Sequence, residues 1–108
     1  MPAPMPTLTA EERIASLEKA KEARRVRAQF KQALQSGEKT FEDAFARQRD
    51  EAIGRIKVYD LLLTLPQVGE TRADAIMKEA QIAPNRRLKG LGKRQIEELL
   101  EIEKKYRG

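Results

Sequence analysis

The sequence predicts an all-α protein in which a long N-terminal helix precedes a small helical domain. Apolar residues recur at spacings of three and four along most of the chain, which is the helical period, and glycine and proline separate these segments. No segment shows the apolar–polar alternation of a strand, and no internal repeat is visible. With 108 residues, 40% of them hydrophobic and 36% charged, the chain can bury one modest core and has no room for a deep substrate pocket.

The first residues are rich in proline, which lacks a backbone donor and fixes its own φ. We therefore expect residues 1–8 to form a disordered arm. Thr9 and Glu12 have the spacing of a capping box, so a long helix is expected over residues 10–35, and Gly37 supplies its end. The apolar residues of this helix form two patches, namely Ile14 and Leu17, and Val26, Phe30, Ala33 and Leu34. We expect the second patch to pack on the body and the N-terminal part to project or to lie along a partner.

Four further helices are expected over residues 41–53, 58–65, 70–80 and 93–105, with a loop over 82–92. The residues expected to begin or end the first two of these are Thr40, Gly54 and Pro66. The residues expected to face the core are Phe41, Ala44, Phe45, Gln48, Ala52, Leu61, Leu62, Leu65, Ala73, Ile76, Met77, Ala80, Ile82, Leu88, Leu91, Ile96, Leu99 and Leu100. This division places the two N-terminal helices in residues 9–53 and a separate binding module in residues 54–108.

The composition excludes several classes of function. The chain has no Cys and no His, which excludes disulfides, thiolate nucleophiles, Cys/His zinc sites and imidazole acid–base chemistry. We expect no enzymatic activity, no cofactor, no metal and no small-molecule substrate. No apolar run reaches the roughly 20 residues that span a bilayer, and no signal peptide is visible, so we expect a cytoplasmic protein.

Positive charge is concentrated in the second half of the chain. The sequence has 22 Lys and Arg against 17 Asp and Glu, a net charge of +5. Residues 1–53 have 10 basic and 9 acidic side chains, and residues 54–108 have 12 and 8, so the two net charges are +1 and +4. Between Gln81 and Ile96 there is no acidic residue. A basic balance of this kind favours an anionic partner, which is a nucleic acid, an acidic protein or a membrane surface.

The turn between the third and fourth expected helices is the first candidate anion site. Gly69 can adopt a positive φ and leaves the backbone bare, and Val68 anchors the turn in the core. The first N–H groups of the following helix lack intrahelical partners and, with the helix dipole, fit a phosphate of any base sequence. We expect Thr71 to add a hydroxyl donor and Arg72 a charge, whereas the Glu70 carboxylate competes with a phosphate. A plain helical hairpin is the alternative.

The loop before the last expected helix is the second candidate anion site. Clustered cations coincide there with bare backbone at two glycines and with a helix N-terminus. The candidate residues are Arg86, Arg87, Lys89, Gly90, Gly92, Lys93 and Arg94. A solvated basic loop is the usual role of such a run, but two anion sites in adjacent turns favour contacts with neighbouring phosphates.

A third basic stretch runs from Lys19 to Lys31 in the long helix, with Glu22 as its single acid. A solvated face and a nucleic-acid contact are both open for it. The opposite face lacks a broad apolar stripe, so we do not expect membrane binding. The five aromatic residues offer no platform for stacking single-stranded bases, and no helix gathers base-reading side chains on one face. Weak sequence preference is therefore expected.

Residues 56–102 resemble a helix–two-turns–helix module, as found in one small-subunit ribosomal protein family and in some base-excision glycosylases. The matching residues are Leu65-Pro66-Gln67-Val68-Gly69-Glu70-Thr71-Arg72-Ala73, Ile76, Ile82, Arg87-Leu88, Leu91, Gln95 and Leu99. From about Leu8 to Tyr106 the chain is more similar still to the actinobacterial integration host factor family. That similarity rests on Ala23-Arg24-Arg25, Lys57-Val58, Leu65-Pro66, Val68-Gly69 and, most specifically, Ile82-Ala83-Pro84-Asn85-Arg86-Arg87-Leu88-Lys89-Gly90-Leu91-Gly92.

The resemblance implies an all-helical, nucleoid-associated protein that binds double-stranded DNA through backbone phosphates with little sequence specificity and bends or compacts it. This family shares only a name with the strand-wedge integration host factor of the minor groove. The residues implied to lie at the backbone are Gly69, Thr71, Arg72, Arg86, Arg87, Lys89, Gly90, Gly92, Lys93 and Arg94, supported by Arg24 and Arg25. Glu70 departs from the family pattern, where a basic residue is more typical. We expect a monomer.

Three other functions compete with this one. A ribosomal RNA-binding protein would use the same module, but such proteins usually have a long basic C-terminal tail, and this sequence ends at Gly108. A glycosylase needs a separate domain for its nucleophile, and the residues before Gly54 do not provide one. An adaptor would bind an acidic protein through the basic helix and would not bind DNA. The charge pattern and the resemblance together favour DNA.

Overall fold

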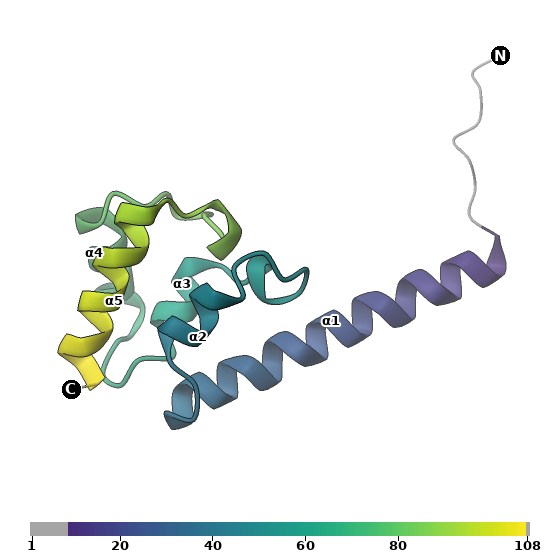
Figure 1. The fold of residues 1–108 in the computed structure, drawn as a ribbon, viewed down its shortest axis with the longest axis horizontal. Coiled ribbons are helices and arrows are strands. Elements are labelled where there is room, and N and C mark those ends of the chain that lie inside the picture. The colour runs from purple at the N-terminus through teal and green to yellow at the C-terminus, as the bar shows by residue number, and fades with distance from the viewer. Residues whose placement is uncertain (1–8, 108) are drawn as a thin grey trace, which may run out of the picture.

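The computed structural model describes residues 9–107. It contains α1 (Ala10–Ser36), α2 (Phe41–Ala46), α3 (Val58–Leu62), α4 (Glu70–Glu79) and α5 (Lys93–Arg107), with two short 3-10 turns, η1 (Ile53–Arg55) and η2 (Leu88–Gly90). No strand occurs within residues 9–107, so the all-α prediction is confirmed. The arm expected over residues 1–8 lies outside the described residues. The molecule measures 57 × 31 × 24 Å, because α1 extends well beyond the helical domain (Figure 1).

The long helix forms where its caps predict it. Thr9 Oγ1 accepts a hydrogen bond from the Glu12 N–H at 3.1 Å, and the helix ends at Gly37, whose φ of 84° is left-handed. Such a φ favours glycine, which has no Cβ to clash. The buried residues of α1 are Phe30 and Leu34, and its exposed large apolar residues are Ile14 and Leu17. The C-terminal part therefore packs on the body and the N-terminal part projects, as expected.

The second helix is shorter than predicted. It was expected to reach residue 53 and to end at Gly54, but Gly54 is buried inside η1. The Asp50 carboxylate accepts hydrogen bonds from the N–H groups of Ala52 and Ile53 at 2.9 and 3.0 Å. Asp side chains offer the backbone such a local alternative to the helix. The pKa of Asp50 lies below its usual value. The hydrogen bond from the Ile53 N–H is the main cause, and those from the Arg47 guanidinium and the Ala52 N–H lower the pKa further.

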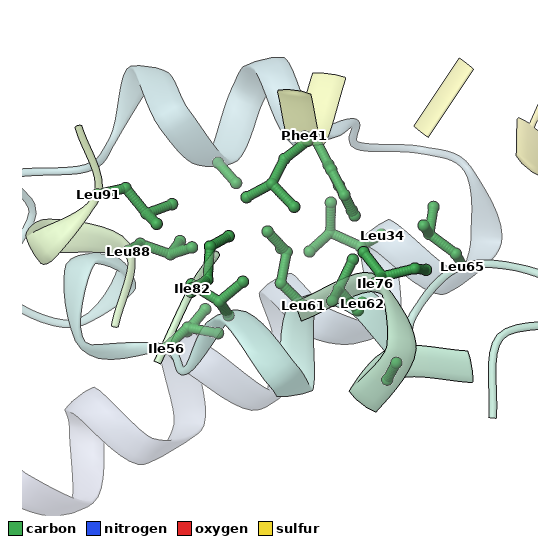
Figure 2. Packing of buried hydrophobic residues seen from close by; sticks show 14 of the residues in the cluster. Leu34, Phe41, Ile56, Leu61, Leu62, Leu65, Ile76, Ile82, Leu88 and Leu91 are labelled. Carbon is green, nitrogen blue, oxygen red and sulfur yellow. The ribbon is translucent and has the colours of Figure 1, made fainter. Parts of the chain in front are cut away.

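The remaining three helices are close to their predicted positions. The third was expected to reach Leu65 but ends at Leu62, because the Thr64 and Leu65 N–H groups bond to carbonyls three residues back and tighten the chain into turns. Of the residues predicted to face the core, Phe45, Gln48, Ile96 and Leu100 are half-buried and all the others are buried. Figure 2 shows this single cluster, with Ile56, Ile82, Leu88 and Leu91 gathered at one end.

Candidate nucleic-acid interface

The second turn is held against the start of α3 by two backbone hydrogen bonds. The Val58 N–H donates to the Arg86 carbonyl at 2.9 Å, and the Leu88 N–H donates to the Ile56 carbonyl at 3.0 Å. Leu88 and Leu91 are buried in the core end seen in Figure 2. Because these backbone bonds and apolar anchors fix the loop, the cations between them are presented to solvent at defined positions.

The exposed side of this turn gathers positive charge. A shallow concavity of 380 Å³ is lined by Asn85, Arg86, Arg87, Lys89 and Gly90. Arg86 Nη1 donates to the Gly90 carbonyl at 3.2 Å, and Arg87 Nη1 donates to the Arg55 carbonyl at 2.9 Å. A guanidinium has five N–H donors, so each arginine is braced by the backbone and keeps donors for an anion. Three cations and no carboxylate line this surface.

The start of α5 extends the same surface. The Gly92 N–H donates to Gln95 Oε1 at 3.1 Å, and the first turn of α5 has no acidic residue. Arg94 is partly engaged, because its guanidinium donates to Gln81 Oε1 at 3.2 Å and lies 3.4 Å from a Glu98 oxygen. Lys93 is exposed beside it. The helix dipole and these cations make this N-terminus favourable for an anion.

The backbone of the first turn is open to solvent at Gly69, but its conformation differs from the predicted one. Gly69 is the N-cap of α4 with an extended φ of −96°, and the positive φ falls on Gln67 at 65°. The expected left-handed conformation at Gly69 is therefore wrong. The prediction that the backbone at Gly69 is unobstructed is confirmed, since a Cβ there would meet no atom within 4 Å. Val68 is buried and anchors the turn as predicted.

Charge at the first turn is close to balanced. A concavity of 660 Å³ is lined by Gln67, Gly69, Glu70, Thr71, Arg72 and Ala75, with one cation and one carboxylate. Arg72 donates to the Gln67 carbonyl at 3.4 Å, and its guanidinium lies 5.7 Å from the Tyr106 ring centre. Partial burial raises the pKa of the nearby Tyr59, and the Glu70, Asp74 and Asp60 carboxylates raise it further. Glu70, which lines the first turn, makes the potential there less positive than at the second turn.

The two predicted residues of the long helix differ in their surroundings. Arg24 is exposed, whereas the Arg25 guanidinium forms an ion pair with Glu22 on the same helix. Neither lines either turn. Instead, a recess beside the second turn brings the predicted Arg87 together with residues that were not predicted to contact DNA. Its lining is Arg27, Lys31, Arg55, Ile56, Lys57, Asp60 and Arg87.

Gln48 positions the second turn, and no local signal in the sequence indicated this role. Its Nε2 donates to the Leu88 carbonyl at 2.7 Å and to the Leu91 carbonyl at 3.0 Å. We expect Gln48→Glu to destabilise the protein by about 1–3 kcal/mol, because a carboxylate cannot donate to these carbonyls. Chemical denaturation measures the loss. The exposed Gln32→Glu is the matched control, and an equal effect of the two changes would contradict this role.

The chain has clear relatives among known proteins. A family model described as S13-like H2TH domain matches residues 34–102. Two proteins named integration host factor are 48% identical, from Mycolicibacterium smegmatis and Mycobacterium tuberculosis, each match covering 90% of this chain and 93% of theirs. A solved structure of sIHF bound to an 8bp palindromic DNA superposes with a TM-score of 0.71 at 36% identity, covering 82% of this chain and 98% of that one.

Two features are absent from residues 9–107. No helix in this range is both long and apolar enough to cross a membrane. No group of three or more acidic residues within it lies close enough together to hold a metal ion.

Proposed function

Since the chain belongs to the integration host factor family, we propose that it is a nucleoid-associated protein that binds double-stranded DNA through backbone phosphates and bends or compacts it. It acts as a monomer in the cytoplasm, with little sequence preference. The sIHF structure with bound DNA supports this proposal. The two relatives that match most of this chain at 48% identity are named integration host factor, which favours neither a ribosomal RNA-binding function nor an enzyme.

The observation that carries the proposal is the second turn, where three exposed cations lie in the loop that leads into α5, with no carboxylate among the residues that line it. Phosphates fit such a surface irrespective of the base sequence. The proposed contact residues are Gly69, Thr71, Arg72, Arg86, Arg87, Lys89, Gly90, Gly92, Lys93 and Arg94, supported by Arg24 and Arg25. The second turn supplies most of the affinity, since Glu70 offsets the charge of the first.

The salt dependence of binding tests the proposal. If about five phosphates are neutralised, log K for a random-sequence duplex falls against log salt with a slope of roughly −4 to −5, because each contact releases condensed counterions. Fluorescence anisotropy at several salt concentrations measures it. Duplexes of different base composition should give the same slope. A slope near zero, or tight binding to a single sequence alone, would contradict backbone recognition.

A further inference from the structure

A basic recess lies where the long helix meets the DNA-binding module. It has a volume of 250 Å³, and its five cations come from separate parts of the chain. Arg27 and Lys31 belong to α1, Arg55 to η1, Lys57 to the step before α3, and Arg87 to the second turn. The pairing of residues 56–58 with 86–88 brings the last three together. The fold therefore brings together in this recess positive charges that are up to 60 residues apart in sequence.

These cations are not neutralised by the protein. Among residues 9–107, none of the five takes part in an ion pair, although six ion pairs form elsewhere in the same range. Asp60 is the single acid in the lining, so the formal charge of the recess is +4. Placing like charges around one concavity is unfavourable without a counter-ion. The surroundings of the recess thus favour a multivalent anion.

The amount and the placement of this charge distinguish two kinds of phosphate. A phosphodiester of duplex DNA has a single negative charge, which leaves most of the positive charge of the recess unbalanced. A terminal phosphate has about −1.5 to −2 near pH 7, and a diphosphate group has more. Donors that converge from four segments suit oxygens that radiate in several directions, whereas a duplex backbone contacts a surface from one side.

We propose that the recess formed by Arg27, Lys31, Arg55, Lys57 and Arg87 binds a diphosphate group, either free pyrophosphate or the diphosphate of a nucleotide. Its volume is that of about eight water molecules at roughly 30 Å³ each, which holds such a group and leaves a nucleoside outside. Arg87 also lines the second turn, so an occupied recess competes with DNA for this side chain. The competition with DNA rests on the proposed function, whereas binding of the anion does not.

Isothermal titration of the full chain with inorganic pyrophosphate tests the recess without DNA. We expect one site per chain, at least about tenfold weaker in Arg27→Gln/Lys57→Gln, because two charge-assisted contacts are lost. The matched control is Lys104→Gln/Lys105→Gln, which removes the same charge from the exposed end of α5 and should bind within about twofold of the native chain. A parallel titration with ADP assigns the source: weaker binding than pyrophosphate indicates the free ion, and tighter binding indicates a nucleotide.

Pyrophosphate bound equally by the native chain and the Arg27→Gln/Lys57→Gln variant, or not bound at all, would overturn the proposal. DNA titrations at constant ionic strength separate this outcome from failure of the proposed function. If the native chain binds duplex but not pyrophosphate, and the variant binds duplex more weakly, the recess is a DNA contact and the inference fails alone. If pyrophosphate binds in the recess and duplex does not bind, the inference stands and the proposed function fails.

Discussion

Replacing Arg86 and Arg87 together by glutamate is expected to weaken duplex binding by at least about 100-fold at moderate salt. Each arginine presents exposed donors to a phosphate, and contacts of this kind contribute about 1.5–3 kcal/mol when charged. Charge reversal also adds repulsion from the backbone. The slope of log K against log salt should become shallower by about two, because two fewer counterions are released. Anisotropy titrations of the native chain and the double variant measure both quantities.

The control for this change must alter the same net charge elsewhere. Lys104→Glu/Lys105→Glu does so at the far end of α5, about 16 Å along the helix axis from Lys93, and should reduce the affinity by less than about fivefold through long-range electrostatics alone. Thermal unfolding checks that the Arg86→Glu/Arg87→Glu variant stays folded, since Arg87 also donates to the Arg55 carbonyl. Equal losses in the two charge-reversed variants would mean that net charge, and not the second turn, governs binding.

Glu103→Ala is expected to lower the free energy of unfolding by about 3 kcal/mol. Glu103 is buried, and its Oε2 accepts hydrogen bonds from the Phe41 N–H at 2.8 Å and from Arg107 Nε at 3.0 Å. Arg107 also donates to the Leu34 carbonyl at 2.6 Å. The carboxylate therefore joins α5 to the start of α2 and, through Arg107, to the end of α1. Its removal leaves a largely buried guanidinium without its partner, which is strongly destabilising.

Denaturant unfolding followed by circular dichroism measures this loss. Glu101→Ala on the same helix is the matched control, because its ion pair with Lys104 has both side chains 76% exposed, and exposed pairs contribute about 0–1 kcal/mol. Similar unfolding free energies for the two alanine variants would show that Glu103 does not hold the helices together. Below its unfolding transition, Glu103→Ala should keep its affinity for DNA, since Glu103 lies in neither turn.

Local signals predicted the helices well where they act alone. Thr9 and Gly37 cap the two ends of the long helix, and α5 forms where the spacing of apolar residues predicts it. The segment after Ala46 was predicted wrongly because short-range contacts within residues 48–54, which the apolar spacing does not reveal, end the helix there. Gly54 packs so closely against the Gln48 carbonyl that a Cβ would collide with it, and this approach turns the chain where helical spacing alone would continue the helix.

At the candidate site, distance along the chain decided what could be predicted. The cations of the second turn are adjacent in sequence, so their clustering was predictable. The recess was not, because Arg27 and Lys31 approach Lys57 only after α1 has packed on the module through Phe30 and Leu34. The role of Gln48 was hidden for the same reason, since its two acceptors lie 40 and 43 residues away.

The most direct test of the central claim is an amide chemical-shift map of the ¹⁵N-labelled full chain titrated with a short duplex. The claim is that the second turn lies on the DNA backbone, so the largest shifts should fall on residues 85–94, with smaller ones on residues 67–72. The amides of residues 104–107 should stay unchanged. Shifts confined to α1, with residues 85–94 unperturbed, would contradict the account and place the DNA contact on the long helix instead.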